Sequence, residues 1–217
     1  MQGPHAKLLK AEFSAEYCSG LFSDELDQLG VQGRVVPGFR LNQSTHRMFG
    51  RARTVRLETM ETTDERIKEG LGFLDQLNEG DVLVVAGSDD FAYFGELMSR
   101  MAMRRRLAGV VIDGLTRDTY FTTTIDLPIF ARGYSPIDIK GRGRVSAVDV
   151  DIDVGGVAVS PGDFVFGDND AVVLLKQDVM PALLEKVNRT AAREDAIKRH
   201  IASGMSVEEL LKVTSSF

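Results

Sequence analysis

The sequence predicts an α/β protein in which a mostly parallel central sheet is followed by a β-rich second half and a long C-terminal helix. Between residues 51 and 133, strand-length apolar runs alternate with helical patterns, and this alternation requires crossover connections and parallel strands. After Gly133, short alternating runs are separated by Gly-Gly, Pro-Gly-Asp and Asp-Asn-Asp, which is typical of antiparallel strands with tight turns. A charged amphipathic pattern over 177–203 predicts the final helix.

The individual elements follow from the same patterns in chain order. Residues 8–29 look helical, and Ser23 and Asp24 are possible caps of a short second helix. Apolar runs and alternation predict strands at 51–58, 81–86, 109–113 and 127–133. Helices are expected at 64–80, where Ile67, Leu71, Leu74 and Leu77 share one face, after the loop 87–90, and after Ser206, where SVEEL resembles a capping box. The segment 115–125 is expected to be a short helix or a loop.

Chain length and apolar content bound the organisation of the protein. The 217 residues, 43% of them hydrophobic, fit one sizeable globular domain or a domain with an appended helical tail. We expect an α/β domain over 1–176 and a helical extension over 177–217. The longest apolar runs, such as 82–86, are far below the roughly 20 residues of a membrane span. The N-terminus has no apolar core of the signal-peptide type, so a soluble cytoplasmic protein is expected.

Charge and cysteine content exclude several classes of function. A formal charge of −6 argues against a broad nucleic-acid surface. The local exception is the arginine run from Arg100 to Arg106, which we interpret as a solvated helix face or a subunit contact. Cys18 is the single cysteine, so intrachain disulfides and multi-cysteine metal sites are excluded, and we expect this side chain to be packed.

The candidate chemistry rests on carboxylates, arginine and backbone amides. Histidine occurs only at positions 5, 46 and 200, and residues 81–135 contain no His, Cys or Lys. A Ser-His-Asp triad, a cysteine nucleophile or a Schiff-base lysine in this core is therefore not expected. The remaining groups suit a hard divalent cation, because Mg²⁺ prefers oxygen ligands and often needs only one or two protein carboxylates.

Two carboxylates follow an apolar run in the stretch VVIDGLTRD. Asp113 and Asp118 are expected at and just past the carboxyl end of a parallel strand, where open α/β sheets place their ligand crevices. Two plainer interpretations remain open. Asp113 can be a turn residue before Gly114, and Arg117 with Asp118 can be a salt bridge at a helix start.

A helix after residue 90 offers a second constellation. Phe94, Leu97, Met98 and Met101 have the spacing of one helix face, which predicts that this face packs on the sheet. The helix has two possible starts.

A start near Gly95 would leave the amides of Leu97 and Met98 free to hold an anion, with Glu96 at the rim of the crevice. A start at Ser88 or Asp89 would leave Glu96 merely exposed, and local sequence does not separate the two.

Two further motifs are weaker. GRGRVS lacks the third glycine of a dinucleotide fingerprint and follows no apolar strand. Asp163, Asp168 and Asp170 are too few ligands at calcium-loop spacing, so we interpret them as turn residues.

Several ordered motifs together carry a family resemblance. They are GRARTV (50–55), GEL followed by GVVIDGLTRD, LPIFARG, and GGVAVSPGDFVFGDNDAVV. Over roughly residues 15–176, the chain resembles the RraA-like family, which contains 4-hydroxy-4-methyl-2-oxoglutarate/4-carboxy-4-hydroxy-2-oxoadipate aldolase and the regulator of ribonuclease E activity A. The older methyltransferase label for such sequences is not supported, because no glycine-rich cofactor loop is found.

The resemblance to the aldolase branch implies a class II pyruvate aldolase with Mg²⁺ or Mn²⁺. It implies a three-layer RraA-like fold, a homotrimer or homohexamer with sites between subunits, a 2-oxo acid substrate, and oxaloacetate decarboxylase side activity. It also implies that the helical extension over 177–217 packs on a neighbouring subunit. From the negative charge and the short apolar runs we expect no nucleic-acid or membrane partner.

The resemblance also implies roles for single residues. Asp118 resembles the metal ligand, and Arg117 resembles the group that contacts the pyruvate carbonyl and stabilises the enolate. Leu97 and Met98 match positions whose backbone amides hold the substrate carboxylate, with Gly95 in the same substrate-binding segment. Glu96 matches a carboxylate that binds metal-coordinated water. Asp113 lies in the same motif, but no direct role is carried onto it.

The C-terminal helix bears on the choice between the two branches. Glu194, in a segment that resembles the aldolase tail, would reach the metal waters of a neighbouring subunit, or else lie on a solvated face. The alternative function is a non-catalytic regulator that acts through protein contacts, and such members can lack the metal-binding Asp and the long helix. Asp170-Ala171-Val172 loses a family turn glycine, and MRRRLAG replaces a small link, which suggests a divergent member.

Overall fold

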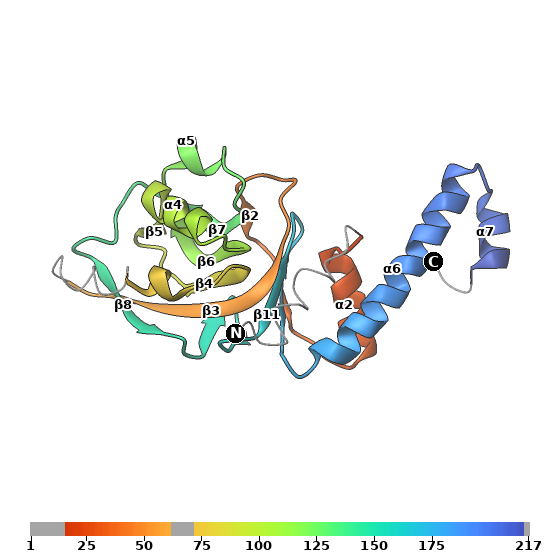
Figure 1. The fold of residues 1–217 in the computed structure, drawn as a ribbon, viewed down its shortest axis with the longest axis horizontal. Helices are drawn as coiled ribbons and strands as arrows, with labels where there is room; N and C mark the ends of the chain where they lie inside the picture. The colour runs from red at the N-terminus through yellow and green to blue at the C-terminus, as the bar shows by residue number, and fades with distance from the viewer. Residues whose placement is uncertain (1–15, 62–71, 215–217) are drawn as a thin grey trace.

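Four parallel strands form the centre of the fold in the computed structural model, which describes residues 16–61 and 72–214. In spatial order they are β3 (Met48–Thr59), β4 (Asp81–Ala86), β6 (Gly109–Thr116) and β7 (Ile129–Tyr134) (Figure 1). The predicted parallel centre, and the β/α order that led to it, are therefore confirmed.

Antiparallel strands extend this centre on both sides. β2 (Arg40–Leu41) pairs with β7, and β11 (Phe164–Gly167), β12 (Val172–Leu175) and β1 (Val35–Val36) continue outward from β3. β8 (Gly143–Val148) pairs with the second half of β3, whereas β11 pairs with its first half. β3 is therefore shared by two antiparallel partners along one edge, as Figure 1 shows, and the β-rich second half is confirmed.

The faces of the sheet are covered by different layers. Alternate residues of β4 face opposite sides, so Leu83 and Val85 join one apolar cluster while Val82 and Val84 join another. The first cluster lies under α4 (Glu96–Arg104) and the 3₁₀ helix η1 (Gly72–Gln76), and the second lies under the hairpin β9 (Ile152–Val154) and β10 (Val157–Val159). Burial on both faces explains why this strand is a continuous apolar run.

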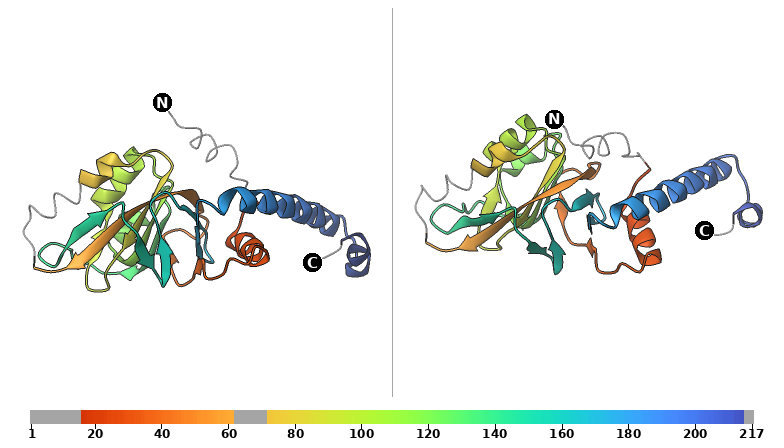
Figure 2. Two further views of the ribbon diagram at one scale, coloured as in Figure 1. Left: turned by 90° about the horizontal axis from the view of Figure 1, so that it is seen from below. Right: turned by 60° about the horizontal axis from the view of Figure 1, so that its bottom comes forward.

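The helical extension packs on the antiparallel end of the sheet. α6 (Met180–Ala202) buries Met180, Leu183, Val187 and Ala191 against a cluster that contains residues of α2 (Ser19–Gln28). Figure 2 shows the second half of α6 projecting away from the sheet, with α7 (Val207–Val213) at its end. The capping box at Ser206 is confirmed by hydrogen bonds in both directions with Glu209. The two-part division at residue 176, and a contact with a neighbouring subunit, stay predictions.

Some local predictions are wrong at α2, and residues 8–15 of the expected helical stretch lie outside the described residues. α2 is one helix that begins after Cys18, so Ser23 and Asp24 lie inside it and do not cap a second helix. Cys18 is exposed, because its extended backbone is the N-cap of α2 and lies outside the packed face.

The helix expected at 64–80 falls partly outside the described residues. Residues 72–76 form only the short η1, although Leu74 and Leu77 of the expected face are buried. Among residues 16–61 and 72–214, no helix has the length and apolar character that crossing a bilayer requires.

The largest difference from the expected elements lies beside β6. The strand continues past Asp113 to Thr116 because a short unpredicted strand, β5 (Ala92–Phe94), pairs with its last residues. The pairing of β6 with β7 shifts register between Ile112 and Leu115. Asp113 is therefore inside the strand and not in the turn that was one interpretation of it.

Candidate active site

Two neighbouring parallel strands end side by side at one edge of the sheet. β5 leads through Gly95 into α4, and β6 leads through Arg117 and Asp118 into the short helix α5 (Thr119–Thr122). The amide of Arg117 and the hydroxyl of Thr116 both donate to the carbonyl oxygen of Phe94, at 3.0 and 2.6 Å. These bonds fix the two chain segments to each other where the strands end.

Gly95 is the N-cap of α4, which decides between the two possible helix starts. A Cβ atom at this position would lie 2.4 Å from Asp118 Oδ2 and 2.9 Å from Arg117 Cγ. Only glycine allows the start of α4 to approach the other two residues so closely.

The packing face predicted for this helix is partly wrong. Phe94 belongs to β5, and the side chain of Leu97 is 75% exposed. The buried residues of α4 are Met98, Ser99 and Ala102. Because Leu97 and Met98 lie in the first turn, helix geometry provides no intrahelical acceptor for their amides.

Asp118 is held in an unusual backbone conformation between β6 and α5. Its φ of 59° and ψ of 44° are in the left-handed region, which aspartate visits more readily than most side chains. Its Oδ2 atom accepts a hydrogen bond of 2.9 Å from the amide of Glu96. Among the described residues, no protein group contacts Oδ1 within hydrogen-bond distance. Asp118 therefore joins the two segments and keeps an oxygen for another ligand.

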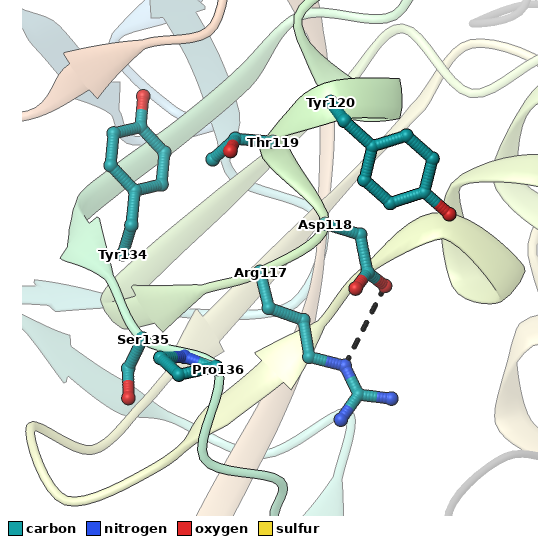
Figure 3. Close-up of a pocket in the computed structure, with 7 residues that line it drawn as sticks. All are labelled: Arg117, Asp118, Thr119, Tyr120, Tyr134, Ser135 and Pro136. Atoms are coloured by element: carbon teal, nitrogen blue, oxygen red, sulfur yellow. Dashed lines mark ion pairs between the residues drawn. The ribbon is translucent and has the colours of Figure 1, made fainter.

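Arg117 lies between two carboxylates. Its Nε is 3.6 Å from Asp118 Oδ2, as the dashed line in Figure 3 marks, and its Nη1 is 2.7 Å from Asp138 Oδ2. Sequence reasoning missed Asp138. The signal that could have found it is its position in SPID, shortly after β7, at the same edge of the sheet as Asp118.

Glu96 is held at the rim by two side chains. Arg100 donates to Oε1 from Nε and Nη2 at 2.9 and 2.7 Å, and the Tyr120 hydroxyl donates to Oε2. The Tyr120 hydrogen bond, with the Arg100 hydrogen bonds and charge, lowers the pKa of Glu96 below its ordinary value. The same contact with Glu96 raises the pKa of Tyr120, because the phenolate would face a carboxylate.

The arginine run is only partly on a helix. Arg100, which contacts Glu96, lies on α4, and its guanidinium is 4.3 Å from the ring centroid of Phe121. Arg105 is the C-cap of α4 and lies 3.0 Å from a carboxylate oxygen of Asp75, and Arg106 follows with a φ of 56° and lies 3.6 Å from one of Glu79. The interpretation as a helix face therefore holds for the first part of the run and is wrong for Arg105 and Arg106.

An open hollow of about 340 Å³ lies beside Arg117 and Asp118. Figure 3 shows both side chains pointing the same way from the end of β6, with Tyr120 beyond Asp118. The hollow is lined by Arg117, Asp118, Thr119, Tyr120, Tyr134, Ser135 and Pro136. Its other polar groups are hydroxyls, so this part of the molecule can receive a small polar molecule beside a carboxylate and a guanidinium.

Asp113 has a different environment from Asp118. Its Oδ1 pairs with Arg132 Nε at 2.6 Å, and its Oδ2 accepts from the amide of Gly155 at 2.7 Å. These bonds connect β6 with β7 and with the turn of the β9 to β10 hairpin, so Asp113 stabilises the packing of these elements.

The other acidic candidates also have structural partners. Asp163 Oδ2 accepts from Lys176 Nζ at 2.7 Å and from the amide of Ser160 at 2.9 Å. Asp168 Oδ1 accepts from the amide of Asp170 at 3.0 Å. Within 16–61 and 72–214, no group of three or more His, Cys, Asp or Glu residues is placed to hold a metal ion.

Glu194 does not join the other candidate residues within one chain. It lies on α6, which extends from the antiparallel end of the sheet, whereas α4 and α5 lie at the other end (Figures 1 and 2). A role at the site of a neighbouring subunit stays a prediction.

Comparisons with known proteins agree on one family. A family model described as RraA-like, Aldolase/RraA, matches residues 21–174. A protein of Halalkalibacterium halodurans named "Putative 4-hydroxy-4-methyl-2-oxoglutarate aldolase" is 30% identical over 189 residues, which cover 84% of each chain. Protein DlpA of Legionella pneumophila is 26% identical over 193 residues, and the match covers 88% of this chain but 31% of DlpA.

A solved structure extends the comparison to three dimensions. Streptomyces coelicolor RraAS2, described as an unusual member of the RNase ES inhibitor RraA protein family, matches with a TM-score of 0.74 and 26% identity. The match covers 84% of this chain and 91% of RraAS2.

Proposed function

Because the chain belongs to the RraA-like, Aldolase/RraA family, we propose that it is a class II pyruvate aldolase that uses a divalent metal ion. It cleaves a 4-hydroxy-2-oxo acid such as 4-hydroxy-4-methyl-2-oxoglutarate, and it also decarboxylates oxaloacetate, since both reactions leave the enolate of pyruvate. One observation carries the proposal. Arg117 and the open oxygen of Asp118 lie side by side at a hollow of about 340 Å³.

The residues at the end of β6 fit a hard divalent cation. Mg²⁺ and Mn²⁺ take oxygen ligands, and Mg²⁺ commonly keeps several waters and binds one or two protein carboxylates. Asp118 would hold the ion directly, and Glu96 would hold it through water, as would Glu194 of a neighbouring subunit. When bound, the ion supplies a Lewis acid for the oxygens of the 2-oxo acid.

The protein's own charges would orient the substrate. Arg117 would contact the keto oxygen, where negative charge develops as the carbon–carbon bond breaks, so its positive charge stabilises the transition state more than the ground state. The substrate carboxylate would accept hydrogen bonds from the amides of Leu97 and Met98, aided by the positive end of the α4 dipole.

The proton of the 4-hydroxyl group must leave as that carbon becomes a carbonyl, and the enolate must then gain a proton to give pyruvate. Glu96 stays ionised at neutral pH because Tyr120 and Arg100 hold its pKa low. It can therefore orient a water molecule that carries the proton between these two positions.

The test is pyruvate release from 4-hydroxy-4-methyl-2-oxoglutarate and from oxaloacetate, with Mg²⁺ or Mn²⁺ and with EDTA. We expect Asp118→Ala to reduce kcat/KM by at least about 10³-fold, since loss of metal catalysis removes several kcal/mol of transition-state stabilisation. The matched control is Asp126→Ala, whose fully exposed carboxylate lies 3.6 Å from His46. Metal-independent turnover, or full activity of Asp118→Ala, would contradict the mechanism.

The site would be completed between subunits of a trimer or hexamer. The projecting half of α6 is the element that would carry Glu194 to a neighbour. Light scattering of the purified protein measures the molar mass of the assembly. A monomeric mass at working concentration would exclude a site shared between subunits.

A second candidate is a non-catalytic protein that binds and inhibits a ribonuclease, and the likeness to RraAS2 favours it. Retention of Arg117, Asp118 and Glu96 at one edge favours the enzyme. Inhibition of a ribonuclease E-type enzyme by wild type and Asp118→Ala alike, without turnover of either 2-oxo acid, would support the regulator.

A further inference from the structure

The three nitrogen atoms of the Arg117 guanidinium have different surroundings. Nε lies 3.6 Å from Asp118, and Nη1 lies 2.7 Å from Asp138. Among the described residues, no group pairs with Nη2. One nitrogen of a fixed planar group is therefore left for an external acceptor, and which nitrogen is left depends on the two carboxylates.

Asp138 is anchored by its backbone to the strand that leads into the site. The amide of Ala92 donates to the carbonyl oxygen of Ile137 at 2.8 Å. The amide of Ile139 donates to the carbonyl oxygen of Ala92 at 3.2 Å. Asp138 itself forms an isolated parallel bridge with Ala92. β5, which ends at Gly95, therefore determines the position of the Asp138 carboxylate relative to α4 and Asp118.

The charges explain what this anchoring achieves. Two opposite charges a few ångströms apart attract each other strongly where they are partly shielded from water, and the side chains of Arg117 and Asp118 are 32% and 31% exposed. Without a second carboxylate, the flexible arginine side chain would be drawn onto Asp118. It would then occupy the oxygens that a cation requires.

We propose that Asp138 is a positioning residue, which holds the Arg117 guanidinium away from Asp118 and leaves Nη2 free for the keto oxygen of a 2-oxo acid. The proposal rests on the function proposed above for this site. Its consequence is that one carboxylate supports two binding events, because Asp118 stays open to a cation and Arg117 stays aimed at the substrate.

The experiment compares Asp138→Asn with wild type in oxaloacetate decarboxylation over a range of Mg²⁺ concentrations. We expect kcat to fall about tenfold and the Mg²⁺ concentration that gives half of the maximal rate to rise about tenfold. The reason is that a misplaced Arg117 guanidinium no longer stabilises the transition state and lies against the Asp118 oxygens that the cation requires. The matched control is Asp126→Asn, which removes an exposed carboxylate elsewhere. Unchanged thermal unfolding of both variants excludes a general loss of structure.

A double-mutant comparison tests whether Asp138 acts through Arg117. On the background of Arg117→Ala, Asp138→Asn should cause little further change in kcat or in Mg²⁺ dependence. An equal effect on both backgrounds would overturn the proposal, and so would wild-type kcat and Mg²⁺ dependence in Asp138→Asn.

Calorimetric titration with Mg²⁺ alone separates this proposal from the proposed activity. If wild type turns over no 2-oxo acid but Asp138→Asn binds Mg²⁺ about tenfold more weakly than wild type, the activity fails and the positioning role stands. If the two proteins bind Mg²⁺ equally, or neither binds it, the positioning role fails as well.

Discussion

Asp113 and Asp118 lie five residues apart near the end of the same chain segment, and the regions around them differ in one respect. Both oxygens of Asp113 are taken by protein donors, Arg132 and the amide of Gly155. One oxygen of Asp118 is taken by the amide of Glu96, and the described residues leave the other open. The difference teaches that, of these two carboxylates, the one with an oxygen left open by the protein donors can bind a cation directly, whereas the saturated one stabilises the fold.

Glycines repeat the same contrast. A Cβ atom at Gly114, next to Asp113, would lie 2.4 Å from the backbone nitrogen of Ser88, so this glycine lets two backbone segments approach. A Cβ atom at Gly95 would meet the side chains of Asp118 and Arg117. The first glycine serves the packing of the sheet, and the second serves the arrangement of the site.

Among changes that keep both carboxylates, the largest expected effect is on activity. Gly95→Ala should reduce kcat/KM by about 100-fold, because the added methyl group displaces Asp118 and Arg117 from the positions that bind ligands. Steady-state pyruvate release by Gly95→Ala and by wild type measures this fall in kcat/KM.

Gly114→Ala is the comparison for this prediction. It should destabilise the protein by about 2 kcal/mol in urea unfolding, since the clash is with backbone that cannot move cheaply. If Gly95→Ala instead lost stability and kept its activity per folded molecule, the contrast between the two glycines would be wrong.

The sequence predicts this contrast only in part. The order of strands and the edge where Asp118 lies follow from apolar runs and motif order, and they are confirmed as geometry. The start of α4 at Gly95 was one of two possibilities that the sequence left open. β5 was not predicted, because Phe94 also fits the spacing of a helix face with Leu97 and Met98, and the strand forms by pairing with Leu115 and Thr116, which are distant in sequence. Asp138 was missed because a bridge between it and Ala92 of β5, which is also distant in sequence, brings it to Arg117.

A smaller effect is expected from Asp113→Asn. The change leaves Arg132 without its charged partner, and an amide cannot accept at both positions that the carboxylate oxygens occupy. We expect the free energy of unfolding to fall by about 1–3 kcal/mol, with activity of the folded protein nearly unchanged. Urea unfolding followed by circular dichroism measures it.

The matched variant is Asp118→Asn, for which we expect nearly wild-type stability and lost activity. Loss of activity in Asp113→Asn without a change in stability would show that the saturated carboxylate is also part of the site.

The smallest effect is expected at Glu209, a third carboxylate whose partner is a helix terminus in the exposed tail. Glu209 accepts from the amide and the hydroxyl of Ser206, and these bonds hold its pKa below the ordinary value. Because the pKa of Glu209 is lowered in the folded state, the cap contributes its full stabilisation of α7 at pH values above the ordinary glutamate pKa. This stabilisation is lost as the pH falls through the lowered pKa. The protection factors of the α7 amides, which compare the exchange rates measured by NMR with the intrinsic rate at each pH, should therefore fall in acid for wild type but not for Glu209→Gln, with the protection of β6 the same in both. An equal fall in both proteins would mean that the cap is not the cause, and a change at β6 would mean that the tail and the sheet unfold as one unit.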